Sequence, residues 1–82
     1  MVRVAFGHIF RKNFSKIKNA SLKNKIITQI SKLKVNPLVG KPMRYSRKGT
    51  REIYIKPFRL SYMYIEKDDK VILLDLYHKN KQ

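Results

Sequence analysis

The chain has no cysteine among its 82 residues, and only five of its residues are acidic. Without cysteine, neither a disulfide nor a thiolate metal site can form. This composition fits a reducing cytoplasm. No apolar run approaches the roughly 18 residues of a membrane-spanning helix, and the N-terminal residues lack the pattern of a signal peptide. We therefore expect one cytoplasmic domain, residues 1–82, without a membrane partner.

Metal and cofactor chemistry finds little support in the sequence. His8 and His78 are the only histidines, and they stand at opposite ends of the chain. The acidic residues form no ligand cluster, so we predict no metal site. The composition does not exclude a Ser-His-Asp triad, but the chain has no G-x-S-x-G nucleophile elbow. It also has no glycine-rich phosphate loop, which argues against nucleotide hydrolysis, and we predict no cofactor.

Positive charge is what the sequence has in excess. Twenty Lys and Arg residues against five Asp and Glu residues give a formal net charge of +15. Solubility alone needs a net charge of only about 2–8 in a small domain, so a field this strong favours a polyanionic partner. We favour nucleic acid over membrane, because no segment joins a wide apolar face to a basic one as an interfacial helix does. A lysine-rich surface that serves only solubility is the alternative.

The first half of the chain has the pattern of a strand followed by two amphipathic helices. Alternation at Val2, Val4 and Phe6 predicts a short first strand. Apolar side chains at helical spacing then predict helices over about residues 8–18 and 21–35. Two helices separated by so short a break indicate a hairpin that packs one apolar face on a sheet.

Ser21 and Asn36-Pro37 mark the expected ends of the second helix. Serine is a favourable N-cap, and the residue before a proline avoids the helical region. Residues 36–50 are then predicted to form a loop. This loop is either an ordinary solvated connection or a basic flap that contacts phosphates, since surface loops serve both purposes. Its cations are Lys41, Arg44, Arg47 and Lys48.

The second half of the chain alternates apolar β-formers with arginine, lysine and tyrosine. It predicts strands over about residues 51–56, 58–66 and 70–78. Pro57 lacks a backbone donor, so we expect a turn or bulge between the first two of these strands. The order β-α-α-β-β-β predicts an α+β fold, in which a helical hairpin packs on a small, mainly antiparallel four-stranded sheet.

The cationic strands carry the residue types that metal-free RNA cleavage requires. Attack by the ribose 2′-hydroxyl needs an acceptor for its proton, cations around the phosphate and an acid for the departing 5′-oxygen. Arginine suits the phosphate because its planar fork binds bidentately, and histidine suits proton transfer near neutral pH. Tyrosine can stack unpaired bases. The predicted catalytic residues are Arg51, Arg59, His78 and Lys79, and the predicted RNA-binding residues are Lys41, Arg44, Arg47, Lys48, Lys56 and Tyr77.

Each of these residue types also has a purely structural interpretation. Arg59 can be an ordinary solvent-facing strand residue. Tyrosines such as Tyr54, Tyr62 and Tyr64 more often pack in a core or on a sheet than stack on bases. Glu52 can act as a general base, but is more commonly a salt-bridge partner of nearby cations.

The alternation of the last strand separates two of the predicted catalytic residues. Counting by two places His78 with Ile72 and Leu76, and places Tyr77 with Lys79 on the opposite face. A strand that stays regular to its end cannot bring His78 and Lys79 into one site. Either His78 lies past the strand end, or only one of the two is catalytic.

Three short segments occur in an order typical of one family. The sequence NPLVGKPM at 36–43 ends a helix, FRLSY at 58–62 is an aromatic-Arg-apolar-x-Tyr strand, and LYHK at 76–79 closes the last strand. With the order of strand, helical hairpin and three-stranded meander, these segments resemble the RelE/ParE superfamily of small bacterial and archaeal toxins. The resemblance covers nearly the whole chain.

The resemblance implies a microbial RNase fold, cleavage of mRNA in the ribosomal A site and a cognate antitoxin that covers the active face. By motif, Arg59 matches the arginine that holds the scissile phosphate, and Arg51 lies where the preceding strand contributes a basic group. His78 matches a late histidine that acts as acid or base. Lys79 stands where another branch of the family has arginine, and no tyrosine follows Tyr77.

Two other functions fit the same sequence. ParE-type toxins share the fold but inhibit DNA gyrase without cleaving RNA, since a fold does not fix a function. A non-catalytic basic domain that binds nucleic acid is supported by the charge alone.

Overall fold

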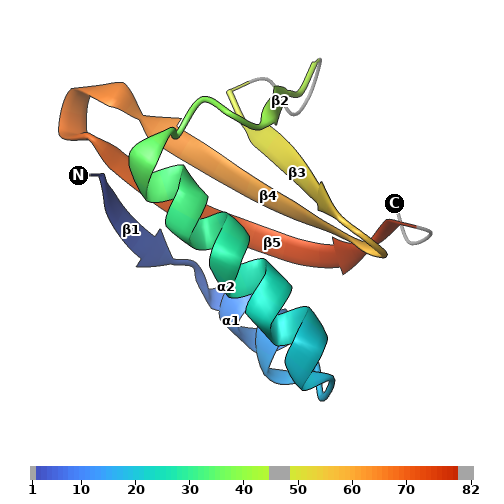
Figure 1. The fold of residues 1–82 in the computed structure, drawn as a ribbon. Helices are drawn as coiled ribbons and strands as arrows, with labels where there is room; N and C mark the ends of the chain where they lie inside the picture. The colour runs from blue at the N-terminus through green and yellow to red at the C-terminus, as the bar shows by residue number, and fades with distance from the viewer. Residues whose placement is uncertain (1, 45–48, 80–82) are drawn as a thin grey trace.

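The computed structural model describes residues 2–44 and 49–79, which form one sheet with two helices packed against it (Figure 1). The sheet has five strands in the order β1-β5-β4-β3-β2. Only the β1–β5 pair is parallel. In chain order, the elements are β1 (Arg3–Phe6), α1 (His8–Ser15), α2 (Ala20–Val35), β2 (Lys41–Pro42), β3 (Arg51–Ile55), β4 (Phe58–Ile65), a 3₁₀ turn (Glu66–Asp68) and β5 (Lys70–His78).

The predicted α+β fold with a helical hairpin is confirmed, but the predicted number of strands is wrong. The sequence predicts four strands, and the structure adds β2 at the outer edge of the sheet. Its two residues, Lys41 and Pro42, pair with Glu52 and Arg51 of β3. A segment of two residues is too short to show alternation, so the pattern of the sequence does not reveal it.

Both helices differ slightly from their predicted bounds. The first ends at Ser15 rather than near residue 18, because Lys16 and Ile17 donate to Asn13 and Phe14 in tighter bonds three residues back. The second begins at Ala20, and its N-cap is Asn19 rather than Ser21. The Asn19 side chain accepts a hydrogen bond of 3.1 Å from the backbone N–H of Leu22. Asparagine caps as well as serine does, so the helix starts earlier than predicted.

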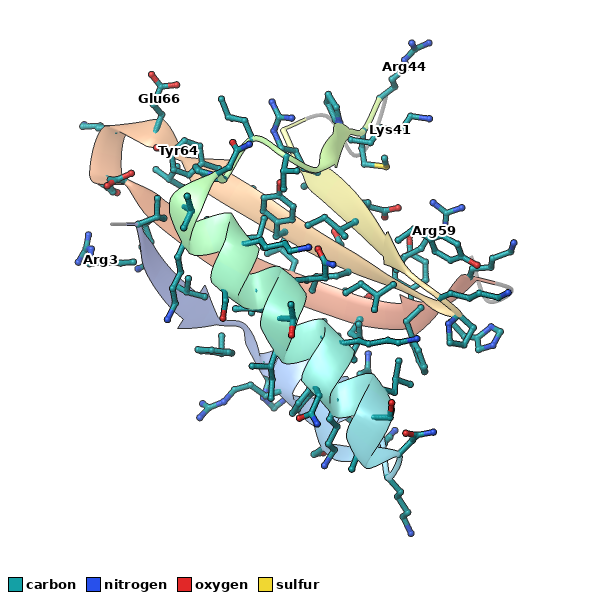
Figure 2. The ribbon with its side chains drawn as sticks, viewed as in Figure 1. Arg3, Lys41, Arg44, Arg59, Tyr64 and Glu66 are labelled. Atoms are coloured by element: carbon teal, nitrogen blue, oxygen red, sulfur yellow. The ribbon has the colours of Figure 1, made fainter. Side chains whose placement is uncertain are left out.

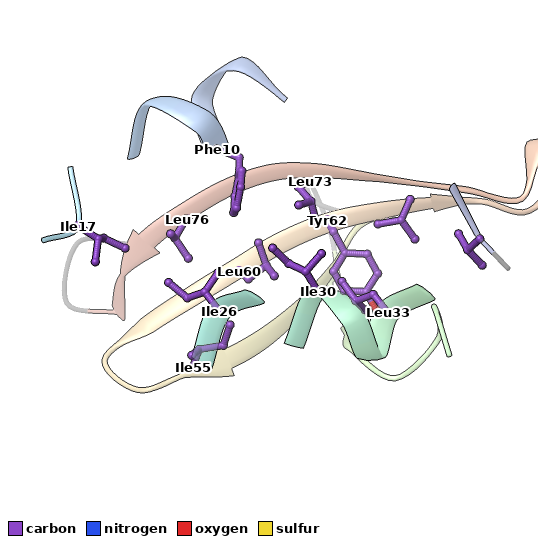
Figure 3. Close-up of a cluster of buried hydrophobic side chains, with 12 residues drawn as sticks. Phe10, Ile17, Ile26, Ile30, Leu33, Ile55, Leu60, Tyr62, Leu73 and Leu76 are labelled. Carbon is purple, nitrogen blue, oxygen red and sulfur yellow. The ribbon is translucent and has the colours of Figure 1, made fainter. Parts of the chain in front are cut away.

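The core lies between α2 and one face of the sheet (Figure 3). Buried residues of α2 meet buried residues of the three long strands, and Phe10 of α1 closes the core beside β5 (Figure 3). Within the described part of the chain, neither helix has the length and apolarity needed to cross a membrane. The fully buried core residues with the largest side chains are Tyr62, Phe10, Ile26, Leu33, Leu60, Leu73, Leu76 and Val71.

A β-bulge interrupts the pairing of β4 with β5. Ser61 pairs with Asp75 and Tyr62 pairs with Leu73, so Leu74 is the extra residue on β5. The bulge shifts the alternation, and Leu73 and Leu76 are both buried although they are three residues apart. The sequence placed Ile72 on the same face as Leu76, and the bulge makes that prediction wrong.

The turn after β3 is formed as Pro57 predicts. Lys56 and Pro57 connect β3 to β4, and the peptide bond between them is cis. After β5, the backbone N–H of Lys79 donates to the carbonyl oxygen of Pro57 at 3.0 Å. This hydrogen bond fixes the residue that follows the last strand beside the β3–β4 turn.

Candidate functional site

The two faces of the sheet carry different residues at the end where β3 turns into β4 and β5 finishes. Tyr54, Arg59 and Tyr77 are direct cross-strand partners on β3, β4 and β5. Directly paired residues point to the same side of a sheet. Leu60 and Leu76 form the adjacent pair and point the other way, into the core under α2. We call the side that carries Tyr54, Arg59 and Tyr77 the Arg59 face, and the side that packs on α2 the helix face.

Two cations converge on one exposed aromatic ring on the Arg59 face. The guanidinium carbon of Arg59 lies 5.6 Å from the centre of the Tyr54 ring, and Nζ of Lys79 lies 5.5 Å from the same centre. Tyr54 is 49% exposed. Cations over an aromatic ring are attracted to its negative face, which holds both of them at the surface. The result is a concentrated, accessible positive charge.

A buried carboxylate lies behind Arg59. The Glu52 residue is 6% exposed, and its Oε1 lies 3.7 Å from Nη1 of Arg59. Its Oε2 accepts a short hydrogen bond from the hydroxyl of Tyr77. Among the described residues, Nε of Arg59 is buried and has no hydrogen-bond partner. Glu52 therefore orients Arg59 and offsets part of its charge, as the salt-bridge interpretation of the sequence predicts.

Arg51 does not share the site with Arg59, although the sequence grouped the two. Arg51 pairs with Tyr62 and so points to the helix face. Its Nη1 donates to the carbonyl oxygens of Leu38 at 3.1 Å and Gly40 at 2.8 Å. These bonds tie the segment after α2 to the sheet. The geometry thus gives Arg51 a structural role. Its side chain makes these hydrogen bonds on the helix face and does not reach the Arg59 face.

Tyr62 completes the attachment of the same segment. Its hydroxyl donates to the carbonyl oxygen of Pro37 at 2.7 Å and accepts from the backbone N–H of Gly40 at 2.9 Å. Burial raises the pKa of this hydroxyl, and the Gly40 hydrogen bond and the charge of Arg51 lower it by smaller amounts. We call Pro37, Leu38, Gly40, Arg51 and Tyr62 the strap.

His78 and Lys79 lie on opposite faces, as the alternation predicts. His78 pairs with Phe58 on the helix face, and the two rings pack edge to face with centres 5.6 Å apart. Lys79 lies over Tyr54 on the Arg59 face. The structure therefore brings Lys79, but not His78, together with Arg59.

The predicted RNA-binding residues are spread over several places. Lys41 is exposed and pairs with Glu52, so it extends the Arg59 face to the sheet edge. Arg44 is exposed beyond β2, and Lys56 is exposed in the β3–β4 turn. Figure 2 shows Lys41, Arg44 and Arg59 on the β2–β3 side of the molecule, far from Arg3 on β1. Arg47 and Lys48 lie outside the described residues.

Tyr54 is the residue of this site that sequence reasoning missed. The sequence assigned it to packing, together with Tyr62 and Tyr64. A signal was present, because Tyr54 alternates with Ile53 and Ile55, and Ile55 is buried. Within residues 2–44 and 49–79, His, Asp and Glu form no group that could hold a metal ion.

Comparison with known proteins places this geometry in a family. The model of the ParE toxin of type II toxin–antitoxin systems matches residues 5–82. The chain is similar to a chain of the RelBE2 toxin–antitoxin complex from Mycobacterium tuberculosis, with 25% identity, a TM-score of 0.84 and coverage of 95% of this chain and 98% of that one. No curated protein sequence matches the chain.

Two further solved structures have the same fold. The isolated RelE toxin of E. coli has 13% identity and a TM-score of 0.81, and the match covers 100% of this chain and 88% of that one. The protein HP0894 from Helicobacter pylori has 26% identity and a TM-score of 0.69, and the match covers 98% of this chain and 97% of that one.

Proposed function

This chain belongs to the ParE toxin family of type II toxin–antitoxin systems. From the geometry of its Arg59 face, we propose that it is a toxin that cleaves mRNA without a metal ion. One observation carries the proposal. Arg59 and Lys79 converge on the exposed ring of Tyr54, on the side of the sheet opposite the core under α2. This arrangement combines two permanent or near-permanent positive charges with an aromatic platform, which suits a phosphate and its neighbouring base.

In the proposed reaction, Arg59 and Lys79 bind the scissile phosphate. The ribose 2′-oxygen attacks phosphorus, the bond from phosphorus to the 5′-oxygen breaks, and the products carry a 2′,3′-cyclic phosphate and a 5′-hydroxyl. The two cations stabilise the charge that grows on the phosphate oxygens. Lys79 also donates the proton that the departing 5′-oxygen takes up.

Two groups at this end of the sheet are candidates for accepting the 2′-hydroxyl proton, and only Glu52 shares a face with Arg59. The Glu52 carboxylate lies behind Arg59 and Tyr77, and the His78 imidazole lies on the other side of β5. The variants Glu52→Gln and His78→Gln remove one acceptor each. The variant that abolishes the cleavage step while leaving RNA binding intact identifies the group that accepts the proton.

The proposed partners are a cognate antitoxin, mRNA and the ribosome. RelBE2 of Mycobacterium tuberculosis was solved as a toxin–antitoxin complex, and so was intact RelBE of E. coli. This chain has exposed apolar side chains on its helices that a protein partner could cover, among them Ile9, Ile27 and Val35. The formal charge of +15 supports association with RNA.

Incubation of the purified protein with translating ribosomes, followed by primer extension, tests the proposal. We expect new mRNA ends with wild type and a loss of roughly 100-fold or more in cutting rate with Arg59→Ala, the usual effect of removing one group that stabilises transition-state charge. Arg3→Ala is the matched control, because Arg3 is exposed on β1, away from the site (Figure 2).

In cells, Arg59→Ala and His78→Ala should relieve growth arrest, and the assigned site is wrong if neither does.

A gyrase-inhibiting toxin is the second proposal, because the family model that matches is that of ParE. A supercoiling assay with purified DNA gyrase separates the two functions. Inhibition of supercoiling without RNA cleavage would replace the nuclease with a gyrase inhibitor. Salt-sensitive RNA binding with neither activity would leave only a basic binding domain.

A further inference from the structure

A cavity of about 450 Å³ opens along the last residues of β5, at the same end of the sheet as the Arg59 face. It lies between the link that joins α1 to α2 and the ends of β4 and β5. The functions above involve its lining residues Tyr77 and His78 but give the cavity itself no role. Its lining residues are Asn13, Lys16, Ile17, Lys18, Asn19, Leu22, Phe58, Leu76, Tyr77 and His78.

The lining has an apolar interior and a cationic mouth. Ile17 and Leu76 are 8% and 1% exposed and belong to the core. Phe58 and His78 contribute a pair of rings in edge-to-face contact. Lys16 and Lys18, which flank Ile17 in sequence, are exposed. An apolar, partly aromatic interior beside two cations matches a nucleotide, which joins a flat base to a phosphate.

The cavity and the Arg59 face are neighbours on β4 and β5. The pair Phe58–His78 lines the cavity, and the next pair along the strands is Arg59–Tyr77. Tyr77 takes part in both places, because it also lines the cavity and its hydroxyl bonds Glu52. Tyr77 therefore links the cavity to the Arg59 face.

We propose that this cavity is a subsite for one nucleotide of single-stranded RNA, a neighbour of the nucleotide whose phosphate binds at Arg59. The base enters the apolar interior beside Phe58 and His78, and Lys16 and Lys18 bind a phosphate at the mouth. The volume lies within the roughly 300–1,000 Å³ of small-molecule sites. The proposal rests on the proposed RNA-cleaving function and adds a place where the chain distinguishes RNA by its bases.

Binding of RNA to the full chain tests the cationic mouth. The probe is a fluorescent single-stranded RNA of about 12 nucleotides, a length that spans a typical single-strand site, and the readout is anisotropy. We expect Lys16→Gln/Lys18→Gln to weaken binding by about fivefold or more at about 0.15 M salt and to reduce the slope of log K against log salt by about 1.4, which is two lost phosphate contacts.

A second double variant removes the same charge elsewhere. Lys32 and Lys34 are exposed near the other end of α2, so Lys32→Gln/Lys34→Gln has the same net charge without touching the cavity. We expect this control to change affinity by less than about twofold, because only long-range charge is lost. Equal effects of the two double variants would overturn the subsite.

A cavity-filling variant tests the role of the base. Leu22 lines the cavity and is only partly buried, so Leu22→Phe should occupy the space with a tolerable change in the core. We expect it to weaken binding of the RNA by about fivefold, yet to leave binding of an abasic strand of the same length unchanged. An equal loss for both strands would overturn the entry of a base. Thermal unfolding checks that Leu22→Phe is folded. If it is not folded, the two double lysine variants decide whether the cavity is a subsite.

The two levels of the proposal fail differently. If wild type cleaves RNA and the variants of the cavity act like their controls, the subsite is wrong and the nuclease stands. If wild type neither binds nor cleaves RNA, the proposed function is wrong, and the subsite is rejected with it.

Discussion

The two arginines of the β3–β4 hairpin, Arg51 and Arg59, have the same chemistry but different environments. Arg51 lies on the helix face and donates to the carbonyl oxygens of Leu38 and Gly40. Arg59 lies on the opposite face, against the Tyr54 ring and 3.7 Å from the Glu52 carboxylate. The two backbone carbonyl oxygens fix the Arg51 side chain in place, so it ties two segments of the chain together. The surroundings of Arg59 leave its side chain 34% exposed, so a phosphate can compete for it.

The face of the sheet on which an arginine lies determines which groups it contacts. Nothing in the identity of the residue separates Arg51 from Arg59. Their positions relative to the buried residues do. Arg51 shares its face with Ile53 and Ile55, whereas Arg59 pairs with the exposed Tyr54. In our proposal the strap serves stability and the Arg59 face serves function, so variants at the two places should affect different measurements.

Gly40→Ala should have the largest effect on stability. A Cβ at this position would lie 2.6 Å from the Tyr62 hydroxyl oxygen and 2.7 Å from Cε1 of the same ring. The buried ring of Tyr62 would have to move, which strains the core and breaks its hydrogen bonds to Pro37 and Gly40. We expect the free energy of unfolding to fall by about 3 kcal/mol, measured by urea denaturation.

The control for Gly40→Ala is Gly49→Ala. Gly49 lies in the β2–β3 connection, and a Cβ there would meet no atom within 4 Å. Its φ of +97° is a conformation that alanine adopts only with strain, so a loss of about 1–2 kcal/mol is expected from the backbone alone. If both variants lose the same amount, crowding against Tyr62 is not what makes Gly40 necessary.

Arg51→Gln should have an intermediate effect on stability. It removes charge-assisted hydrogen bonds to Leu38 and Gly40 in a partly exposed place, so we expect a loss of about 1–2 kcal/mol. Arg59→Gln removes an ion pair whose arginine is partly exposed, and we expect a change below about 1 kcal/mol. Thermal unfolding of the two variants side by side measures the contrast. Equal losses would remove the distinction between strap and Arg59 face.

Alkaline pH should produce the smallest effect, and it acts on the strap. Burial raises the pKa of the Tyr62 hydroxyl in the folded chain. An unfolded tyrosine ionises near about pH 10, so the stabilisation from the neutral hydroxyl is complete below that pH and is lost as the pH rises through the folded pKa. The stability difference between wild type and Tyr62→Phe should therefore shrink above about pH 10. A difference that stays constant in urea titrations would contradict the assignment.

Much of the fold follows from the sequence because apolar periodicity marks each long element. The stripe on α2 and the alternation in β3, β4 and β5 reflect burial directly, so these elements were predicted within a few residues. The two-residue strand β2 has no periodicity, and the N-cap at Asn19 competes with an equally good cap at Ser21. Such details depend on tertiary packing that a local pattern does not contain.

The candidate site was less predictable, because it depends on how separate strands align. The bulge at Leu74 changes the alternation along β5, and no residue type in the sequence marks it. The register that sets Tyr54 opposite Arg59 comes from the tight turn at Pro57. The face of Arg51 was predictable from the sequence, since residues 51, 53 and 55 share one face of the strand, but the basic character of the strand outweighed that pattern.

The cleavage rate of Arg59→Gln against that of Arg51→Gln tests the central claim most directly. Both variants lose one positive charge from the same hairpin, so net charge cancels in the comparison. With folded protein quantified and the same translating ribosomes, we predict that Arg59→Gln cuts mRNA at roughly one hundredth of the wild-type rate or less, and that Arg51→Gln stays within about threefold, since it lies outside the site. An equal loss in both variants, or full activity in Arg59→Gln, would contradict the account.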